Sequence, residues 1–310
     1  MVRALADDQD VRTLGLPKGR ATVSPRRIGI HTSVAGGVEN AAERAWRLGC
    51  GTFQIFSSNP RQWKAAEIAS ERAEAMLRLR SRYRLSPLAI HANYLINLAG
   101  AAPELQRCSV AAFRSELQRA LALGAEFLIV HPGSFRGGSR AQGVARVLES
   151  VARAAERLDL AGRLTVLIEN TAGAGCSLGA SFEEVAELAD RLRRVVPAGA
   201  CIDTCHTHVA GYDIVSEDGY AVTLAELQAT VGLHNVSVWH VNDAKAPRGS
   251  RLDRHQHIGR GMIGREVFRR LLHDPRLAHA AFIAETPIDK PGDDRRNVTV
   301  LRRLAGEGKA

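Results

Sequence analysis

Short apolar segments of strand length recur along this chain, and all but one of them end in His, Asp or Glu. The segments are IGIH (28–31), TFQIF (52–56), PLAIH (87–91), FLIVH (127–131), TVLIE (165–169), GACID (199–203), VSVWH (236–240) and AFIAE (281–285). Longer stretches with helical spacing separate them, for example 40–49, 115–124 and 182–195. This alternation of strands and helices predicts a single-domain α/β fold, the TIM (β/α)8 barrel.

An open, doubly wound parallel sheet is the structural alternative. Such sheets often carry a glycine-rich phosphate loop after the first strand, but SVAGGVEN (33–40) does not match GxGxxG. The barrel is therefore favoured, with a domain over 28–310. Residues 1–27 carry charges without periodicity and are predicted to form a poorly ordered basic tail.

Composition narrows the class of protein. The 310 residues carry a formal net charge of +9, which favours polyanionic partners. No segment approaches the ~18 consecutive apolar residues of a membrane helix, and no signal-peptide core is visible, so a cytoplasmic protein without a membrane partner is expected. We also expect a monomer without an obligate protein partner.

The five cysteines, at 50, 108, 176, 201 and 205, are interpreted as reduced interior thiols. Zinc binding by the C-x3-C pair 201/205 is disfavoured.

The polar residues at the strand ends are predicted to share one cleft. In a TIM barrel the carboxyl ends of all strands converge on one face, where the chemistry of such barrels takes place. A lone strand-end His is usually structural, and His31 is left open between the two interpretations. Several buried carboxylates and imidazoles together, however, would repel or desolvate one another unless cations lay between them. The set therefore predicts metal binding.

The types of ligand atom among these strand-end residues indicate which metal ion they would bind. Nitrogen and oxygen ligands in this mixture suit zinc and, less selectively, manganese or iron. Nine candidates exceed the needs of one ion and fit about two or three. His208 and His257 are expected to be exposed or solvated rather than ligands. The candidate ligands are His91, His131, Glu169, Asp203, His206, His240, Asp253, His255 and Glu285.

A set of ordered motifs resembles the endonuclease IV family of apurinic/apyrimidinic endonucleases. The motifs are IGIHTSVAGG (28–37), NPRQW (59–63), HANYLINLA (91–99), HPGS (131–134), IENTAG (168–173), CIDTCH with AGYD (201–213), HVNDAK (240–245), GSRLDRH (249–255) and AET (284–286). The similarity covers nearly the whole chain from Ile28 onward. Ala92-Asn93 and His208 depart from the family pattern, so no family role is carried over to them.

The resemblance implies a zinc-dependent nuclease that cuts double-stranded DNA on the 5′ side of abasic sites, leaving a 3′-hydroxyl and a 5′ deoxyribose phosphate. It implies three zinc ions, with manganese as a possible substitute. The first is held by His91 and His131, with Glu169 bridging to the second. Asp203, His240 and Glu285 complete the second ion, and His206, Asp253 and His255 bind the third.

Further roles follow for the two glutamates and for residues outside the ligand set. We hypothesise that Glu169 and Glu285 act catalytically by orienting the attacking water. The resemblance implies that Arg61 and Tyr94 enter the minor groove at the damaged nucleotide. Lys245, Arg248 and Arg251 are expected to contact DNA phosphates.

Two alternatives remain at this stage. A metal-dependent sugar isomerase or epimerase could gather similar ligands on a related barrel, but it would need about one or two ions. A barrel that binds damaged DNA without cutting it is the other alternative. The presence of every inferred ligand disfavours the second, and the additional group His206, Asp253 and His255 disfavours the first.

Overall fold

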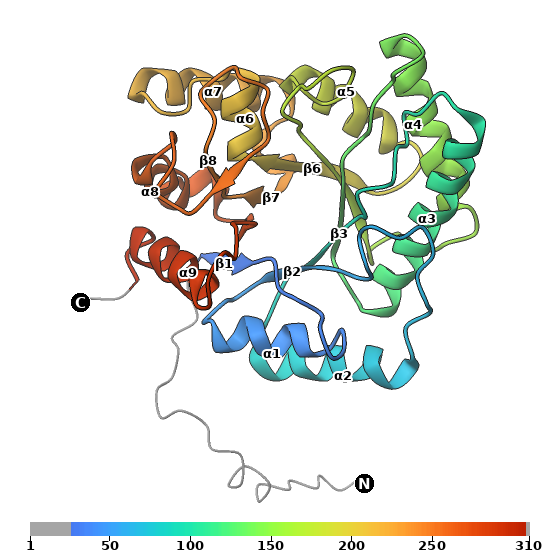
Figure 1. Cartoon of the computed structure of the whole chain (residues 1–310), viewed down its shortest axis with the longest axis horizontal. Helices are drawn as coiled ribbons and strands as arrows, with labels where there is room; N and C mark the ends of the chain where they lie inside the picture. The colour runs from blue at the N-terminus through green and yellow to red at the C-terminus, as the bar shows by residue number, and fades with distance from the viewer. Residues whose placement is uncertain (1–25, 308–310) are drawn as a thin grey trace, which may run out of the picture.

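The barrel predicted from the sequence is confirmed by the computed structural model, which describes residues 26–307. In this part of the chain one eight-stranded parallel sheet has the order β1-β10-β7-β6-β5-β4-β3-β2 (Figure 1). A parallel bridge between His31 and Gln54 then joins β1 to β2, so the sheet closes on itself and the open, doubly wound alternative is excluded. The strands are β1 (Arg27–Ile30), β2 (Phe53–Phe56), β3 (Leu88–His91), β4 (Phe127–Val130), β5 (Thr165–Glu169), β6 (Ala198–Asp203), β7 (Val236–His240) and β10 (Ala281–Ala284).

Helices surround this barrel on the outside (Figure 1). The α-helices are α1 (Asn40–Arg47), α2 (Ser70–Tyr83), α3 (Pro103–Ala122), α4 (Arg140–Ala155), α5 (Phe182–Leu192), α6 (Thr204–Ala210), α7 (Glu217–Thr230), α8 (Arg265–His273) and α9 (Asp293–Leu304). Two short 3-10 helices, η1 (Leu233–Asn235) and η2 (Pro275–Leu277), precede β7 and β10. After β7 the chain forms a small antiparallel hairpin from β8 (Asp243–Ala244) and β9 (His255–Gln256).

Local sequence signals set the helix ends. At the end of α3, Gly124 adopts a φ of +62°, which lets the Ala125 N–H donate to the Ala120 carbonyl at 2.9 Å. This glycine ends the helix, because a residue in the left-handed conformation satisfies the last carbonyls of a helix. Helix α4 begins with a capping box, in which Ser139 and Gln142 each accept a backbone N–H from the other.

Two apolar layers stabilise the barrel, one outside the sheet and one inside it. The outer layer packs the strands against the helices, whereas a smaller inner layer fills the barrel. Because successive side chains of a strand point to opposite faces, residues two apart share a face. The inner layer comprises Ala89, Ile129, Leu167, Cys201, Val238, Ala281 and Ile283.

The seam between β1 and β2 depends on a glycine. A Cβ at Gly29 would lie 2.1 Å from the Thr52 carbonyl oxygen, so a side chain there would push the two strands apart. The absence of a side chain instead lets the strands approach, and the Gly51 N–H donates to the Ile28 carbonyl at 2.9 Å.

Several expectations concern the periphery of the fold. Strand β1 begins at Arg27, one residue before the predicted domain start, and residues 1–25 of the predicted tail lie outside the described residues. Within residues 26–307, no helix is long and apolar enough to cross a membrane.

The cysteines are free, but the expectation that all lie in the interior is wrong. Cys108 is exposed because it lies on the outer face of α3, and Cys176 is partly exposed.

Candidate metal centre

The alternation of side chains along the strands aims the predicted ligands into the barrel. On β5, Leu167 belongs to the inner layer, and Glu169 follows it two residues later on the same face. The same spacing relates Cys201 to Asp203 on β6 and Val238 to His240 on β7. The strand ends therefore place their polar side chains directly above the inner layer.

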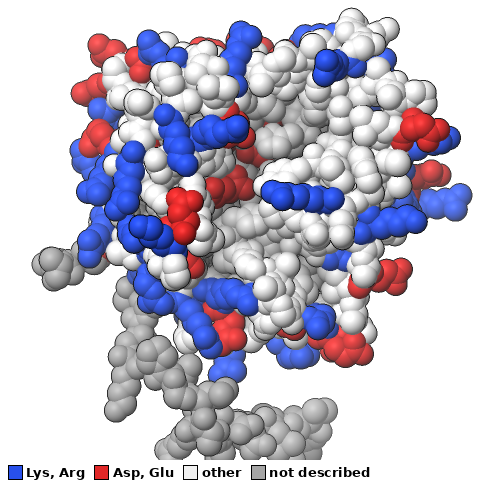
Figure 2. Space-filling model, viewed as in Figure 1, with Lys and Arg blue, Asp and Glu red and all other residues white. Residues whose placement is uncertain are grey.

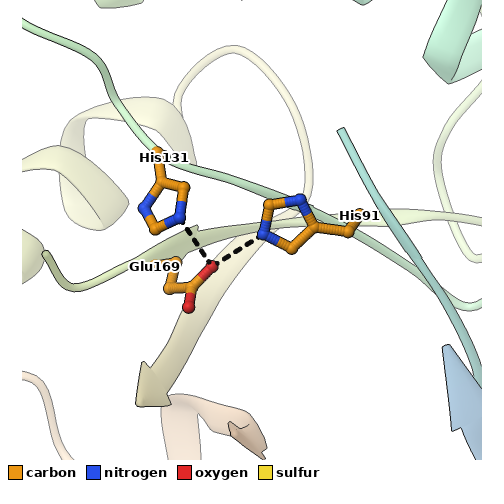
Figure 3. Close-up of side chains that lie close together, drawn as sticks. All are labelled: His91, His131 and Glu169. Carbon is orange, nitrogen blue, oxygen red and sulfur yellow. Dashed lines mark hydrogen bonds and ion pairs between the residues drawn. The ribbon is translucent and has the colours of Figure 1, made fainter. Parts of the chain in front are cut away.

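Eight of the nine predicted ligands lie in three adjoining groups. Within each group, the candidate ligand atoms lie within 4.8 Å of one another. In the first, Nε2 of His91 and Nε2 of His131 lie 3.0 and 3.5 Å from Oε2 of Glu169 (Figure 3). The second comprises Glu169, Asp203, His240 and Glu285, and the third comprises Asp203, His206 and His255.

Asp253 adjoins the third group. Its Oδ2 lies 3.3 Å from Nε2 of His206, and its Oδ1 lies 3.2 Å from Nε2 of His255. Asp203 is shared between the second and third groups, because its Oδ2 lies 3.7 Å from Nε2 of His255. The resemblance had suggested a role for Asp203 at the second ion only.

The histidine rings are oriented by hydrogen bonds on their outer nitrogens. Nδ1 of His91 lies 2.8 Å from the Ala92 carbonyl, and Nδ1 of His206 lies 2.9 Å from the Asn170 carbonyl. In His255, Nδ1 lies 3.1 Å from the Glu285 carbonyl. A carbonyl only accepts, so each Nδ1 carries a proton, and each Nε2 faces the carboxylates and can bind a metal ion once its own proton is displaced. This arrangement is typical of histidines that bind metals.

The electrostatics of the pocket favour ionised carboxylates. Burial opposes ionisation of Glu169, but the charges of His131 and His240 outweigh it and hold its pKa well below the usual value. Burial likewise opposes protonation of His91, yet the hydrogen bond and charge of Glu169 raise the pKa of His91 to about 9. The pKa of His255 also rises to about 9, because the charge of Asp203 and the hydrogen bond to Asp253 outweigh burial. Protons and metal ions would therefore compete for the same nitrogens.

The donor set fits divalent cations. Glu169 and Asp203 are fully buried, and imidazole nitrogens of His91 and His255 lie 3.0 and 3.7 Å from their carboxylate oxygens. Buried carboxylates need a compensating charge, and an ion between the imidazoles and carboxylates would supply one. Burial raises the pKa of the Cys201 and Cys205 thiols, which disfavours the thiolate form that binds metals. Cys201 lies in a group with Glu169 and His240, whereas Cys205 lies in a group with Asp253 and His255.

A cleft of about 220 Å³ opens onto the ligands. Its walls include His31, Phe56, Tyr94, Thr286 and Ile288 beside the candidate ligands. On the face shown in Figure 2, Lys and Arg side chains stand around a central hollow in which carboxylates are visible. Such a distribution suits a negatively charged ligand that reaches bound cations.

Arg61 and Tyr94 lie on two loops that contact each other beside this cleft. The side chain of Tyr94 is 62% exposed, and its ring packs edge-on against Phe56 with centroids 5.0 Å apart. The Tyr94 N–H donates to the Pro60 carbonyl at 3.1 Å, which links its loop to the exposed Arg61. Trp63 packs partly buried against the outer apolar layer, as ordinary packing under a loop predicts.

The three predicted phosphate contacts lie on the segment between β8 and β9. Lys245, Arg248 and Arg251 are all exposed. Arg248 forms an ion pair with Asp213 at 2.7 Å, so a phosphate would compete with this carboxylate.

Two histidines were wrongly expected to be solvated. His208 is buried on α6, and burial lowers its pKa. His257 is also buried, because Asn297 of α9 covers it and donates Nδ2 to its Nδ1 at 3.1 Å. His31 is part of the cleft wall, and its Nδ1 lies 3.8 Å from Glu285.

Sequence reasoning missed residues that support the ligands rather than join them. Asp243 is fully buried in β8, and its carboxylate accepts the N–H groups of Gly259, Gly261 and Ile263 at 2.9–3.0 Å. These bonds anchor the segment that follows the hairpin bearing His255. The position of Asp243 just after a strand was a usable signal, but nothing in the pattern distinguished a backbone acceptor from a ligand.

Glu116 was missed for a different reason, because it lies on α3 and not at a strand end. It is buried, accepts the Ser57 hydroxyl at 2.6 Å and also accepts the backbone N–H of Asn93. Ser57 begins the loop that carries Arg61, and Asn93 precedes Tyr94. One helix carboxyl group thus connects both loops beside the cleft.

Comparison with known proteins first identifies the fold class of this chain. The family described as xylose isomerase-like TIM barrel matches residues 42–304, in agreement with the closed sheet. A D-tagatose 3-epimerase-like protein shares this fold at 18% identity and a TM-score of 0.65, with coverage of 90% of this chain and 97% of that chain. At this identity the likeness concerns the fold alone.

Closer relatives define the family. A probable endonuclease 4 from Solibacter usitatus (strain Ellin6076) is 50% identical over 282 residues, which cover 90% of this chain and 97% of that protein. The crystal structure of endonuclease IV from Thermus thermophilus has 41% identity and a TM-score of 0.81, and covers 91% of this chain and 100% of that chain. The chain belongs to the endonuclease IV family, which confirms the resemblance found in the sequence.

Proposed function

We propose that this protein is a DNA repair endonuclease that hydrolyses the phosphodiester on the 5′ side of abasic sites. The products would be a 3′-hydroxyl end and a 5′ deoxyribose phosphate. The observation that carries this proposal is the convergence of all nine predicted ligands: five of them line one cleft, and the other four lie within 4 Å of another predicted ligand. Membership of the endonuclease IV family supports the nuclease over other barrel activities.

We infer a trinuclear zinc centre in this cleft. His91 and His131 would hold the first ion, and Glu169 would bridge it to the second. Asp203, His240 and Glu285 would complete the second ion, and the third would lie between His206, Asp253 and His255. Zinc supplies Lewis acidity, which offsets the charge of a phosphodiester and makes water a stronger nucleophile near neutral pH.

The two catalytic glutamates would have different tasks. Glu169 is fully buried and ionised among imidazoles, so it would fix the relative positions of the first two ligand groups. The side chain of Glu285 is 17% exposed, and its Oε2 lies 3.2 Å from Nδ1 of His240. It would therefore orient the attacking water.

Recognition of the damaged site would depend on shape. A nucleotide without its base costs less to unstack and extrude, which gives selectivity without sequence readout. The exposed Tyr94 and Arg61 would enter the gap that is left in the stack. Lys245, Arg248 and Arg251 would contact phosphates and make the affinity dependent on salt.

The sugar isomerase or epimerase alternative is less well supported. Similarity to an epimerase-like protein is limited to 18% identity, whereas the endonuclease IV relatives reach 41% and 50%. The additional group formed by His206, Asp253 and His255 exceeds what a site with one or two ions requires.

The decisive experiment uses a duplex with a single abasic site. The zinc-loaded protein should cut the abasic strand once, on the 5′ side, and leave the matched intact duplex uncut. A chelator should abolish cutting, and metal analysis should give about three zinc ions per chain. Tight binding without a cut would favour the binding-only alternative and refute this proposal.

A further inference from the structure

Gln54 of β2 lies fully buried inside the barrel between two candidate metal ligands. Its Oε1 lies 2.8 Å from Nε2 of His240, and its Nε2 donates to Oε1 of Glu285 at 2.6 Å. The same Nε2 lies 3.1 Å from Nδ1 of His31. The carboxamide therefore connects β2 with both β7 and the end of β10.

These contacts fix the orientation of the amide. If the amide were rotated, its oxygen would face the carboxylate of Glu285, and two acceptors would oppose each other at 2.6 Å. The amide nitrogen must therefore face Glu285, and the amide oxygen must face His240. Because that oxygen only accepts, Nε2 of His240 must carry a proton.

The tautomer of His240 follows directly. With the proton on Nε2, the ligating nitrogen is Nδ1, which lies 2.8 Å from Oε1 of Glu169 and 3.2 Å from Oε2 of Glu285. His240 therefore uses Nδ1, whereas His91, His206 and His255 present Nε2. The other three rings donate to backbone carbonyls, but His240 donates to a side chain that a mutation can remove.

We propose that Gln54 is a positioning residue of the metal centre: it sets the tautomer of His240 and holds Glu285 within reach of the same ion. This inference rests on the proposed function and adds a residue outside the nine ligands. Gln54 itself is held rigidly, because its backbone forms the bridge to His31 that closes the barrel. Its carbonyl accepts the Thr32 N–H at 2.8 Å. Residues that orient metal ligands typically change metal affinity by about 10- to 100-fold when replaced.

Two substitutions separate the two contacts. Gln54→Leu removes both the acceptor for His240 and the donor to Glu285. Gln54→Glu keeps an acceptor for His240 but turns a carboxylate toward Glu285. Thr52→Val is the matched control, since Thr52 is equally buried two residues earlier and donates to the Pro87 carbonyl at 2.6 Å.

The readout is zinc affinity of the full-length protein, measured by competition with a chromophoric chelator. Gln54→Leu should weaken the affected ion by about 10- to 100-fold, and Gln54→Glu should also weaken it. Thr52→Val should bind zinc as the wild type does. Equal affinities in all four proteins would overturn the proposal, and so would an equal loss in the Thr52 control.

A second measurement needs no variant. Nitrogen-15 NMR of the zinc-loaded wild-type protein should find the His240 proton on Nε2, and a proton on Nδ1 would overturn the proposal. Failure of the proposed role of Gln54 can be distinguished from failure of the proposed nuclease function. A wild-type protein that binds zinc but leaves abasic DNA intact would refute the nuclease assignment, while the zinc affinities would still decide the role of Gln54.

Discussion

Replacing Asp243 with alanine should loosen the segment that supports the third ligand group. The Asp243 carboxylate accepts three N–H groups between residues 259 and 263, and its strand β8 pairs with the strand that carries His255. Alanine offers no acceptor, so these amides lose a charged partner. We therefore expect lower stability and faster exchange of the amide protons over 257–264.

The size of the effect follows from burial. A hydrogen bond to a charged group contributes about 1.5–3 kcal/mol, and the buried Ile263 amide should lose about 2 kcal/mol. The amides of Gly259 and Gly261 are partly exposed, so water can replace the carboxylate and the loss is about 1 kcal/mol each. The free energy of unfolding should therefore fall by about 4 kcal/mol, or about 6 °C in melting temperature for a chain of this length.

Thermal melting and hydrogen exchange of the zinc-loaded protein test this prediction. Asp289→Ala is the matched control, because the Asp289 side chain is 65% exposed and its change should cost less than about 0.5 kcal/mol. If Asp243→Ala melted within about 1 °C of the wild type and kept slow amide exchange over 257–264, the role of Asp243 in anchoring this segment would be wrong.

Three further predictions concern catalysis, recognition and pH. Glu285→Gln should leave the melting curve intact but reduce incision of an abasic duplex by orders of magnitude; near-normal turnover would contradict its role. Arg61→Ala and Tyr94→Ala should lower the ratio of abasic to intact duplex binding, and an unchanged ratio would exclude both from recognition. The metal-free protein should lose stability from about pH 6.5 to pH 9, because the folded-state pKa values of His91 and His255 are raised to about 9. Saturating zinc should remove this loss, and a flat melting temperature in chelator would refute the assignment.

The architecture was largely predictable because it depends on repeated local patterns. Every predicted strand appears within one or two residues of its expected bounds, and most of the predicted helical stretch 115–124 lies within α3. Helix α3 begins at Pro103, well before the predicted stretch 115–124. Its early turns carry mixed polar residues, so their helical state reflects packing that the local pattern does not reveal.

The candidate metal ligands were predictable for the same reason, whereas the residues that hold the ligands and the neighbouring loops in place were not. A strand-end carboxylate such as Asp203 points into the barrel by the geometry of the strand alone. Glu116, by contrast, reaches the loops beside the cleft from the side of a helix, and His257 is buried and accepts a hydrogen bond from Asn297 of α9. Such contacts depend on tertiary packing between segments far apart in the sequence.

Closure of the barrel through β1 has a consequence for biosynthesis. Of the eight barrel strands in residues 26–307, β1 is made first but pairs with β10, which is made last and is followed by Glu285. A nascent or truncated chain that stops before β10 would therefore lack one carboxylate of the pocket and expose unpaired backbone on β1 and β7. Completion of the pocket is thus tied to synthesis of the chain as far as Glu285.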